Sequence, residues 1–259
     1  MTETVVESIG DVRIYGKGVL GGKGDGLVQI NEKRIPGTHK LRTRILTTSF
    51  YERFLENEGA IPKSDQKTIA SILDDLGDLP ISVRSSATNE ASVLAGGDKS
   101  VHAGENESFM LPNNHPNITV RKQQLFQAIS FIYNDFCSKQ AVGGGEKMSV
   151  VINPIPGTFL KTDVGPVYFP MVSGVASSYF PHALKSQKSD EGFARLAFGH
   201  GYATVIDDFP VISMATIRNP LPGKLLGSRQ KYFYAIDMKR NQMLSGEELE
   251  TMKRMHIRF

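Results

Sequence analysis

A cluster of glycines near the N-terminus constrains the fold more than any other feature. Six glycines fall within residues 16–26, directly after the strand-like run Val12–Tyr15. Glycine loses more backbone freedom on folding than any other residue, so such a cluster indicates unusual dihedrals or a close approach to another group. Lys17 and Lys23 lie in the same segment, and a loop of backbone N–H groups ahead of a helix is an anion site. We therefore expect a strand, an anion-binding loop and a helix from about Asp25, although a flexible surface turn would explain the same glycines.

Two well-known phosphate loops can be compared with this segment. Residues 16–21 match the Gly-x-Gly-x-x-Gly dinucleotide fingerprint by letter. Further glycines occupy the positions of its helix, however, and the sequence predicts no βαβ unit after them. An NAD-binding oxidoreductase is therefore a remote alternative. The P-loop pattern also fails, because Gly24 follows Lys23 where Ser or Thr would bind magnesium.

Arg84 is the second candidate for anion binding. The run Pro80–Arg84 is typical of a buried strand, and Ser85 and Ser86 follow it. An arginine at the end of a rigid strand presents a planar set of donors that suits phosphate oxygens. Taken by itself, Arg84 is explained at least as well by an ion pair with a carboxylate at a sheet edge.

The remaining pattern indicates an α+β protein without the regular alternation of a barrel. We expect helices capped by Thr48 and by Ser64, and a long helix over about Thr119–Gln140, whose apolar residues recur at helical spacing. Further expectations are strands over Met148–Ile152, within Tyr168–Phe180, over Thr204–Ile206 and over Lys231–Asp237, a helix capped by Ser189 around Phe193–Phe198, and a final helix with Ser245 and Glu248 as its capping box.

Composition excludes several classes of protein. The 259 residues carry a net charge of +3, which argues against a dedicated nucleic-acid binder. Cys137 is the single cysteine, so the expected compartment is reducing and cytoplasmic. The N-terminus carries acids instead of a basic signal segment, and the most apolar window, Tyr168–Phe180, is too short to span a bilayer, so we expect a soluble protein. The six histidines show no metal-ligand spacing.

Several segments in order resemble the ATP-binding domain of phosphoenolpyruvate synthases and pyruvate phosphate dikinases. Gly21–Leu27 is similar to that family's glycine–lysine segment, and Val83–Thr88 to its Val-Arg-Ser-Ser-Ala-Thr signature. The other similar segments are Ala103–Ser108, Met110–Pro116, Ser149–Ile152, Ser173–Ala176, Glu191–Ala194 and Gly199–Val205. The resemblance covers most of residues 10–220.

The resemblance implies an ATP-grasp fold, in which two α+β lobes close on ATP and Mg²⁺. Lys23 and Arg84 would be the catalytic cations that neutralise the phosphates during transfer. The Gly104 loop would cover the phosphates, and Asn153 to Ile155 would line the adenine. The nucleotide-binding residues implied are Gly22, Lys23, Arg84, Gly104, Glu107, Asn153 and Ile155, with the metal ligands unassigned.

The sequence also departs from that family. The segment between Glu90 and His102 is about five residues longer than usual, Asn153 stands where Gln is typical, and Tyr202 replaces a polar residue. The family's late Glu and Gln have no counterpart, and its phosphohistidine segment is missing. We therefore expect one ATP-grasp-like nucleotide-binding domain over residues 1–259 that lacks the C-terminal end of that fold. Its first lobe would cover about residues 1–80 and its second about 81–259.

Two functions follow as expectations. The first is an ATP-binding phosphotransfer module that phosphorylates a histidine on a separate domain, in cis or in trans, with kinase activity only when other domains complete it. The second is a non-catalytic nucleotide-sensing or partner-binding module with the same fold. ATP is the expected partner in the first case, with neither nucleic acid nor membrane, and the sequence does not indicate the oligomeric state.

Overall fold

The protein divides into two compact units, Met1–Ile155 and Pro156–Phe259. This computed structural model describes residues 6–33, 39–91, 106–140, 145–163, 165–169, 173–180, 193–199, 212–217, 232–237 and 242–243. The first unit is a mixed α+β structure, and the boundary expected near residue 80 falls inside it, because strands from both sides of that residue share one sheet.

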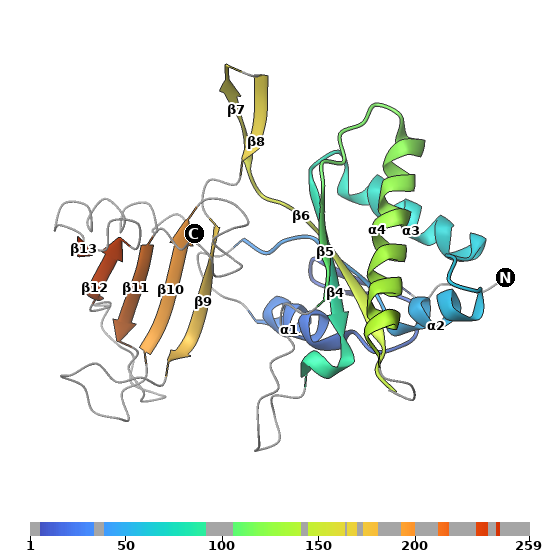
Figure 1. The fold of residues 1–259 in the computed structure, drawn as a ribbon, viewed down its shortest axis with the longest axis horizontal. Coiled ribbons are helices and arrows are strands. Elements are labelled where there is room, and N and C mark those ends of the chain that lie inside the picture. Colours follow the sequence, from blue (N-terminus) through green and yellow to red (C-terminus); the bar gives the residue numbers. More distant parts are fainter. Residues whose placement is uncertain are drawn as a thin grey trace. The chain divides into compact units, whose positions relative to one another are not determined.

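A six-stranded mixed sheet forms the centre of the first unit (Figure 1). Its order is β1-β2-β3-β6-β4-β5, and only the β2–β3 pair is parallel among the pairs of this sheet. The strands are β1 (Val6–Ile9), β2 (Val12–Tyr15), β3 (Thr43–Leu46), β4 (Ile81–Ala87), β5 (Ser108–Leu111) and β6 (Met148–Pro154).

Helices cover both faces of this sheet (Figure 1). The large core lies between the sheet and α2 (Thr48–Glu56), α3 (Lys63–Leu76) and α4 (Ile118–Lys139). The other face of the sheet, which we call the α1 face, is covered by α1 (Gly21–Glu32). A smaller core lies there, and its buried members are Val12, Ile14, Ile45 and Val151.

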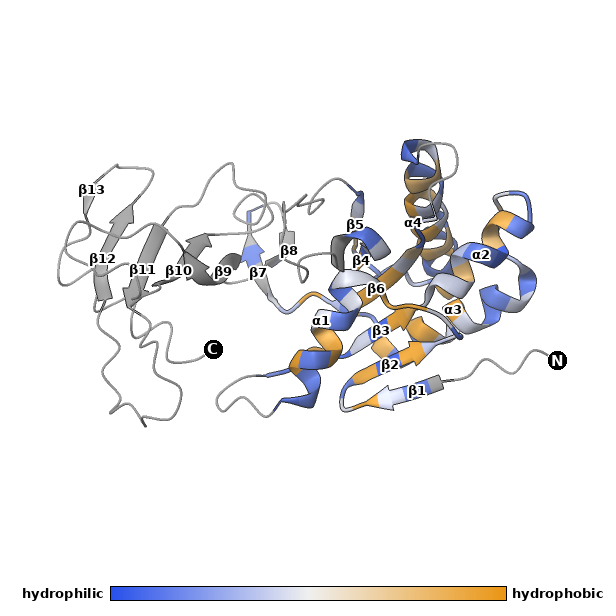
Figure 2. Cartoon of the chain, turned by 90° about the horizontal axis from the view of Figure 1, so that it is seen from below, coloured by the Kyte–Doolittle hydropathy of each residue, from blue (hydrophilic) through white to orange (hydrophobic). Residues whose placement is uncertain are grey.

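Strand alternation decides which side chains reach each face. In β4, Val83 and Ala87 belong to the large core, so Arg84 and Ser86 lie on the α1 face. Figure 2 shows hydrophobic residues along β2 and β3, where Val12, Ile14 and Ile45 are buried in the smaller core. The α1 face of β4 and β6 is instead polar over much of its length, with Ser82, Arg84, Ser86, Ser149 and Asn153.

The long helix expected from the sequence is confirmed as α4, and Asn117 caps it by accepting a hydrogen bond from the Thr119 amide at 2.9 Å. The two expected serine and threonine caps are wrong. α3 begins at Lys63 with Pro62 in the cap position, and α2 begins at Thr48 with Thr47 in that position. Proline supplies the fixed φ that starts α3 without a side-chain hydrogen bond.

The second unit is built of strands in its described part. β7 (Thr158–Thr162) and β8 (Gly165–Phe169) form an antiparallel pair, and five further strands form an antiparallel sheet of order β13-β12-β11-β10-β9. These are β9 (Ser173–Phe180), β10 (Phe193–Gly199), β11 (Ile212–Ile217), β12 (Tyr232–Asp237) and β13 (Gln242–Met243).

The helix expected around Phe193–Phe198 is wrong, because this segment is β10, paired with β9 and β11. The strands expected within Tyr168–Phe180 and over Lys231–Asp237 are confirmed by β8, β9 and β12. The expected strand over residues 204–206 and the helix from Ser245 lie outside the described residues. None of the helices in the described segments combines the length and apolarity that crossing a bilayer requires.

Candidate functional site

The glycine cluster connects β2 to β3 through α1, and these two strands are parallel neighbours. This is a βαβ unit, so the expectation that none follows the glycines is wrong. The sequence obscured it because β3 has only four residues, Thr43–Leu46, of which two are polar. Loops at the carboxyl end of such strands are common ligand sites.

The first two glycines are explained by packing. A Cβ on Gly16, whose φ is 84°, would lie 2.6 Å from Ser49 Oγ, and one on Gly18 would lie 2.7 Å from Thr48 Oγ1. The Val19 amide donates to Thr48 Oγ1 at 3.1 Å, and the Thr48 amide donates to the Val19 carbonyl at 3.1 Å. The loop is therefore pressed against the start of α2.

These contacts weaken the NAD alternative. The fingerprint uses its second glycine to leave room for a pyrophosphate, and it carries an acidic residue near the end of the next strand. Gly18 instead contacts Thr48, and β3 is followed by Thr47 and Thr48. The chain thus has the βαβ topology of a dinucleotide-binding motif but lacks the acidic residue that would bind the ribose at the end of the second strand.

Gly21 marks a different junction, between α1 and β4. Its φ is 70°, and a Cβ there would lie 2.1 Å from the Ser86 carbonyl oxygen. α1 begins at Gly21 and not at about Asp25, so the glycines of the sequence Gly21–Gly26 lie within the helix. Close approach explains Gly21, whereas a Cβ on Gly26 would meet nothing within 4 Å.

Two serine hydroxyls hold the first turn of α1 on the sheet. Ser86 Oγ donates to the Leu20 carbonyl at 2.9 Å and accepts from the Gly24 amide at 3.1 Å. Ser149 lies directly opposite Ser86 on β6, and its hydroxyl donates to the Leu20 carbonyl and lies 3.0 Å from the Ser86 carbonyl oxygen. The start of α1 is thereby fixed to the two longest strands of the sheet.

Arg84 lies two residues before Ser86, on the same face of β4. It is half-buried, and it pairs in register with Val151 of the smaller core. The alternative explanation for Arg84 was an ion pair with a carboxylate at the sheet edge. Within the described segments, none of the ion pairs includes Arg84, so that carboxylate partner is not found there. An arginine on a rigid strand beside a helix start can bind an anion.

Lys23 belongs to the first turn of α1 and is half-buried. It immediately precedes Gly24, whose amide bonds to Ser86, so the structure brings the elements that carry Lys23 and Arg84 together through that serine. Asp25 follows, and partial burial raises the pKa of its carboxyl above the usual value of 3.8. Gly22 is half-buried in the same turn.

The other nucleotide-binding residues predicted from the sequence do not share one location. Glu107 is exposed just before β5, next to Ser108, which pairs with Arg84. Gly104 lies outside the described residues. Asn153 is buried, and its side-chain amide donates to Thr43 Oγ1 at 2.7 Å. The Ile155 amide donates to the Pro80 carbonyl at 2.7 Å, so that donor is already used within the chain.

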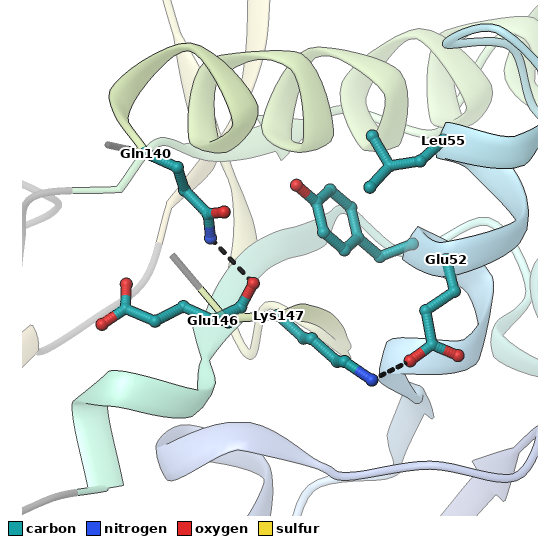
Figure 3. Close-up of a pocket in the computed structure, with 7 residues that line it drawn as sticks. Glu52, Leu55, Gln140, Glu146 and Lys147 are labelled. Carbon is teal, nitrogen blue, oxygen red and sulfur yellow. Dashed lines mark hydrogen bonds and ion pairs between the residues drawn. The ribbon is translucent and has the colours of Figure 1, made fainter. Parts of the chain in front are cut away.

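A pocket of about 210 Å³ lies elsewhere, between α2 and the chain that enters β6 (Figure 3). It is lined by Tyr51, Glu52, Leu55, Gln140, Gly145, Glu146 and Lys147. Two contacts join polar groups of its lining: Lys147 forms an ion pair with Glu52, and Gln140 Nε2 donates to the Glu146 carbonyl at 2.8 Å. The pocket includes none of the residues predicted from the sequence.

The part of the chain that the structure describes contains no cluster of three or more His, Cys, Asp or Glu residues arranged for a metal ion. No family model matches the chain, and a comparison with curated proteins gives no match. The candidate site therefore rests on geometry and charge: a helix start fixed by Ser86 and Ser149, with Lys23 and Arg84 on the joined elements. The contacts of these two serines with α1 were not predicted from the sequence.

Proposed function

We propose that the first unit binds the phosphate chain of ATP at the junction of α1 and β4. The observation that carries the proposal is the Ser86 hydroxyl, which joins the first turn of α1 to β4 two residues from Arg84. Lys23 lies within that same turn. One junction thus combines two cations with a helix start, where the helix dipole is positive.

Each component suits a polyphosphate. Backbone N–H groups in the first turn of a helix bind anions, and the effect is largest within that turn. Arg84 offers a planar set of donors that can bind two phosphate oxygens, and Lys23 offers a compact positive charge. In a phosphoryl transfer these groups would stabilise charge on the phosphates, so Lys23 and Arg84 are the proposed catalytic cations.

The finer proposal is an ATP-grasp arrangement that binds Mg·ATP. Gly22 would belong to the phosphate site, Gly104 and Glu107 to its covering loop, and Asn153 and Ile155 to the adenine site. The Ile155 amide already donates to the Pro80 carbonyl, so this amide is not proposed to read the adenine edge. The expected acceptor is a histidine on a separate domain, in cis or in trans.

Calorimetry of the full chain with ATP, with and without Mg²⁺, tests the proposal. Lys23→Ala and Arg84→Ala should each weaken ATP binding roughly 10- to 100-fold, the range for a lost hydrogen bond to a charged group. Lys67→Ala is the matched control, because Lys67 is an exposed lysine on α3, across the sheet from α1. Unchanged affinity in both site variants would refute the assignment.

A second measurement separates the two functions. Isotope exchange between ATP and its hydrolysis products reports phosphoryl transfer, and it should appear when a phosphohistidine domain is supplied. ATP binding without any exchange would favour the nucleotide-sensing alternative.

A further inference from the structure

We propose that Ser86 and Ser149 are positioning residues that aim the Gly21 amide N–H at the bound phosphate. The inference rests on the proposed function, because it concerns the same site. It adds a role for the two buried serine hydroxyls of β4 and β6.

The hydrogen bonds of the two serines meet at one carbonyl. A carbonyl oxygen has two lone pairs, so the Leu20 carbonyl can accept from both hydroxyls. Ser86 Oγ donates to it at 2.9 Å, and Ser149 Oγ also donates to it. Both serines are fully buried on neighbouring strands, so water does not compete for these bonds.

Fixing this carbonyl also fixes the next amide. The described residues contain no cis peptide bond, so the Leu20–Gly21 peptide is trans. In a trans peptide the N–H points opposite to the C=O within one plane. With the Leu20 carbonyl directed at Ser86 and Ser149, the Gly21 N–H is directed away from both serines.

Gly21 itself supports the same arrangement. Its backbone approaches Ser86 so closely that a Cβ would lie 2.1 Å from the Ser86 carbonyl oxygen. Any side chain at this position would push the Leu20–Gly21 peptide off β4 and take the Leu20 carbonyl out of reach of the hydroxyls. The Gly24 amide, by contrast, already donates to Ser86 Oγ, so it is not the amide proposed to meet the phosphate.

A pair of variants of equal shape tests the hydroxyl of Ser149. Ser149→Thr keeps the hydroxyl and Ser149→Val replaces it by a methyl group of similar size. In calorimetry of the full chain with ATP and with inorganic tripolyphosphate, Ser149→Val should bind both roughly 3- to 10-fold more weakly than Ser149→Thr, as expected for one neutral hydrogen bond. Melting temperatures of the two variants check that both are folded.

Nitrogen–proton NMR gives a readout that a merely structural role would not change. Tripolyphosphate should shift the Gly21 amide resonance strongly in wild type and in Ser149→Thr, and weakly in Ser149→Val. If the branched side chains prevent folding, Ser149→Ala is compared with Ser85→Ala, because Ser85 is a buried serine of β4 on the opposite face. The same loss should then appear in Ser149→Ala alone.

The outcomes separate the two proposals. If wild type binds ATP, Arg84→Ala weakens binding, and Ser149→Val and Ser149→Ala bind as wild type with an unchanged Gly21 shift, the positioning role is overturned while the site stands. If wild type binds neither ATP nor tripolyphosphate, the proposed function is overturned, and the positioning role with it.

Discussion

Gly21 and Ser86 lie closer together than any residue with a side chain would allow. The distance from an added Cβ on Gly21 to the Ser86 carbonyl oxygen would be 2.1 Å, well below a normal contact. Gly21 also has a φ of 70°. Both the lack of room for a Cβ and the backbone conformation therefore require glycine at this position. The first turn of α1 is therefore coupled mechanically to the strand that carries Arg84.

Gly21→Ala should destabilise the protein strongly. The positive φ disfavours alanine, and the clash is with backbone, which cannot rotate away; together these costs are about 2–5 kcal/mol in the free energy of unfolding. Urea unfolding followed by circular dichroism measures the change. A loss of less than about 0.5 kcal/mol, the size of an ordinary surface substitution, would show that α1 does not lie against β4 in this way.

Gly26→Ala should have the opposite effect. Gly26 lies inside α1, and a Cβ there would meet nothing within 4 Å. Alanine in a helix interior is more favourable than glycine by roughly 0.5–1 kcal/mol, so the midpoint of urea unfolding should rise. ATP affinity should stay as in wild type; a large drop in affinity would instead place Gly26 in the ligand site.

The two glycines show what a sequence can and cannot reveal. The cluster predicts an unusual backbone, but it cannot separate Gly21, whose backbone contacts β4, from Gly26, where an added Cβ would meet nothing within 4 Å. The partner of Gly21 is Ser86, far along the chain, and the role of Ser149 depends on Leu20, 129 residues away. Such contacts follow from the sheet order, which local spacing does not encode.

Elements with a long repeat were predictable. α4 is recognised because Leu125, Ile129, Ile132 and Phe136 recur over many turns and face the large core. The segment of β10 is short and apolar, and such a run fits a helix or a strand equally well. Its strand state is decided by pairing with β9 and β11, from other parts of the chain.

Asp75→Asn should cost about 3 kcal/mol of unfolding free energy, the order expected when a buried ion pair loses one partner. Asp75 forms ion pairs with Arg44, which is 3% exposed, and with Arg13, which is 47% exposed. These arginines are register neighbours on β2 and β3, so removing the carboxylate leaves Arg44 buried without its counter-charge. Urea unfolding measures the loss.

Arg13→Ala is the matched control for that prediction. An exposed pair contributes about 0–1 kcal/mol, so this variant should lose far less stability than Asp75→Asn. Equal losses in the two variants would contradict the view that the buried Arg44 is the partner that matters.

Asp25→Asn should make the protein more stable at neutral pH. Burial raises the pKa of Asp25 above 3.8 in the folded state, so the folded protein binds this proton more tightly than the unfolded chain does. Stability then falls as the pH rises from the unfolded to the folded pKa, and the full penalty remains at higher pH. Asn has nearly the same size and helix propensity, so only the charge is removed.

Urea unfolding of wild type and Asp25→Asn across a pH series checks this prediction. The advantage of the variant should be greatest above the raised folded pKa and should shrink toward zero as the pH approaches 3.8, the usual pKa of the group. A variant that is less stable than wild type at neutral pH would show that the Asp25 carboxylate is stabilised by the positive start of α1 more than it is penalised by burial. Repeating the series with tripolyphosphate adds a test of the site, because a bound anion near Asp25 should enlarge the advantage of the variant.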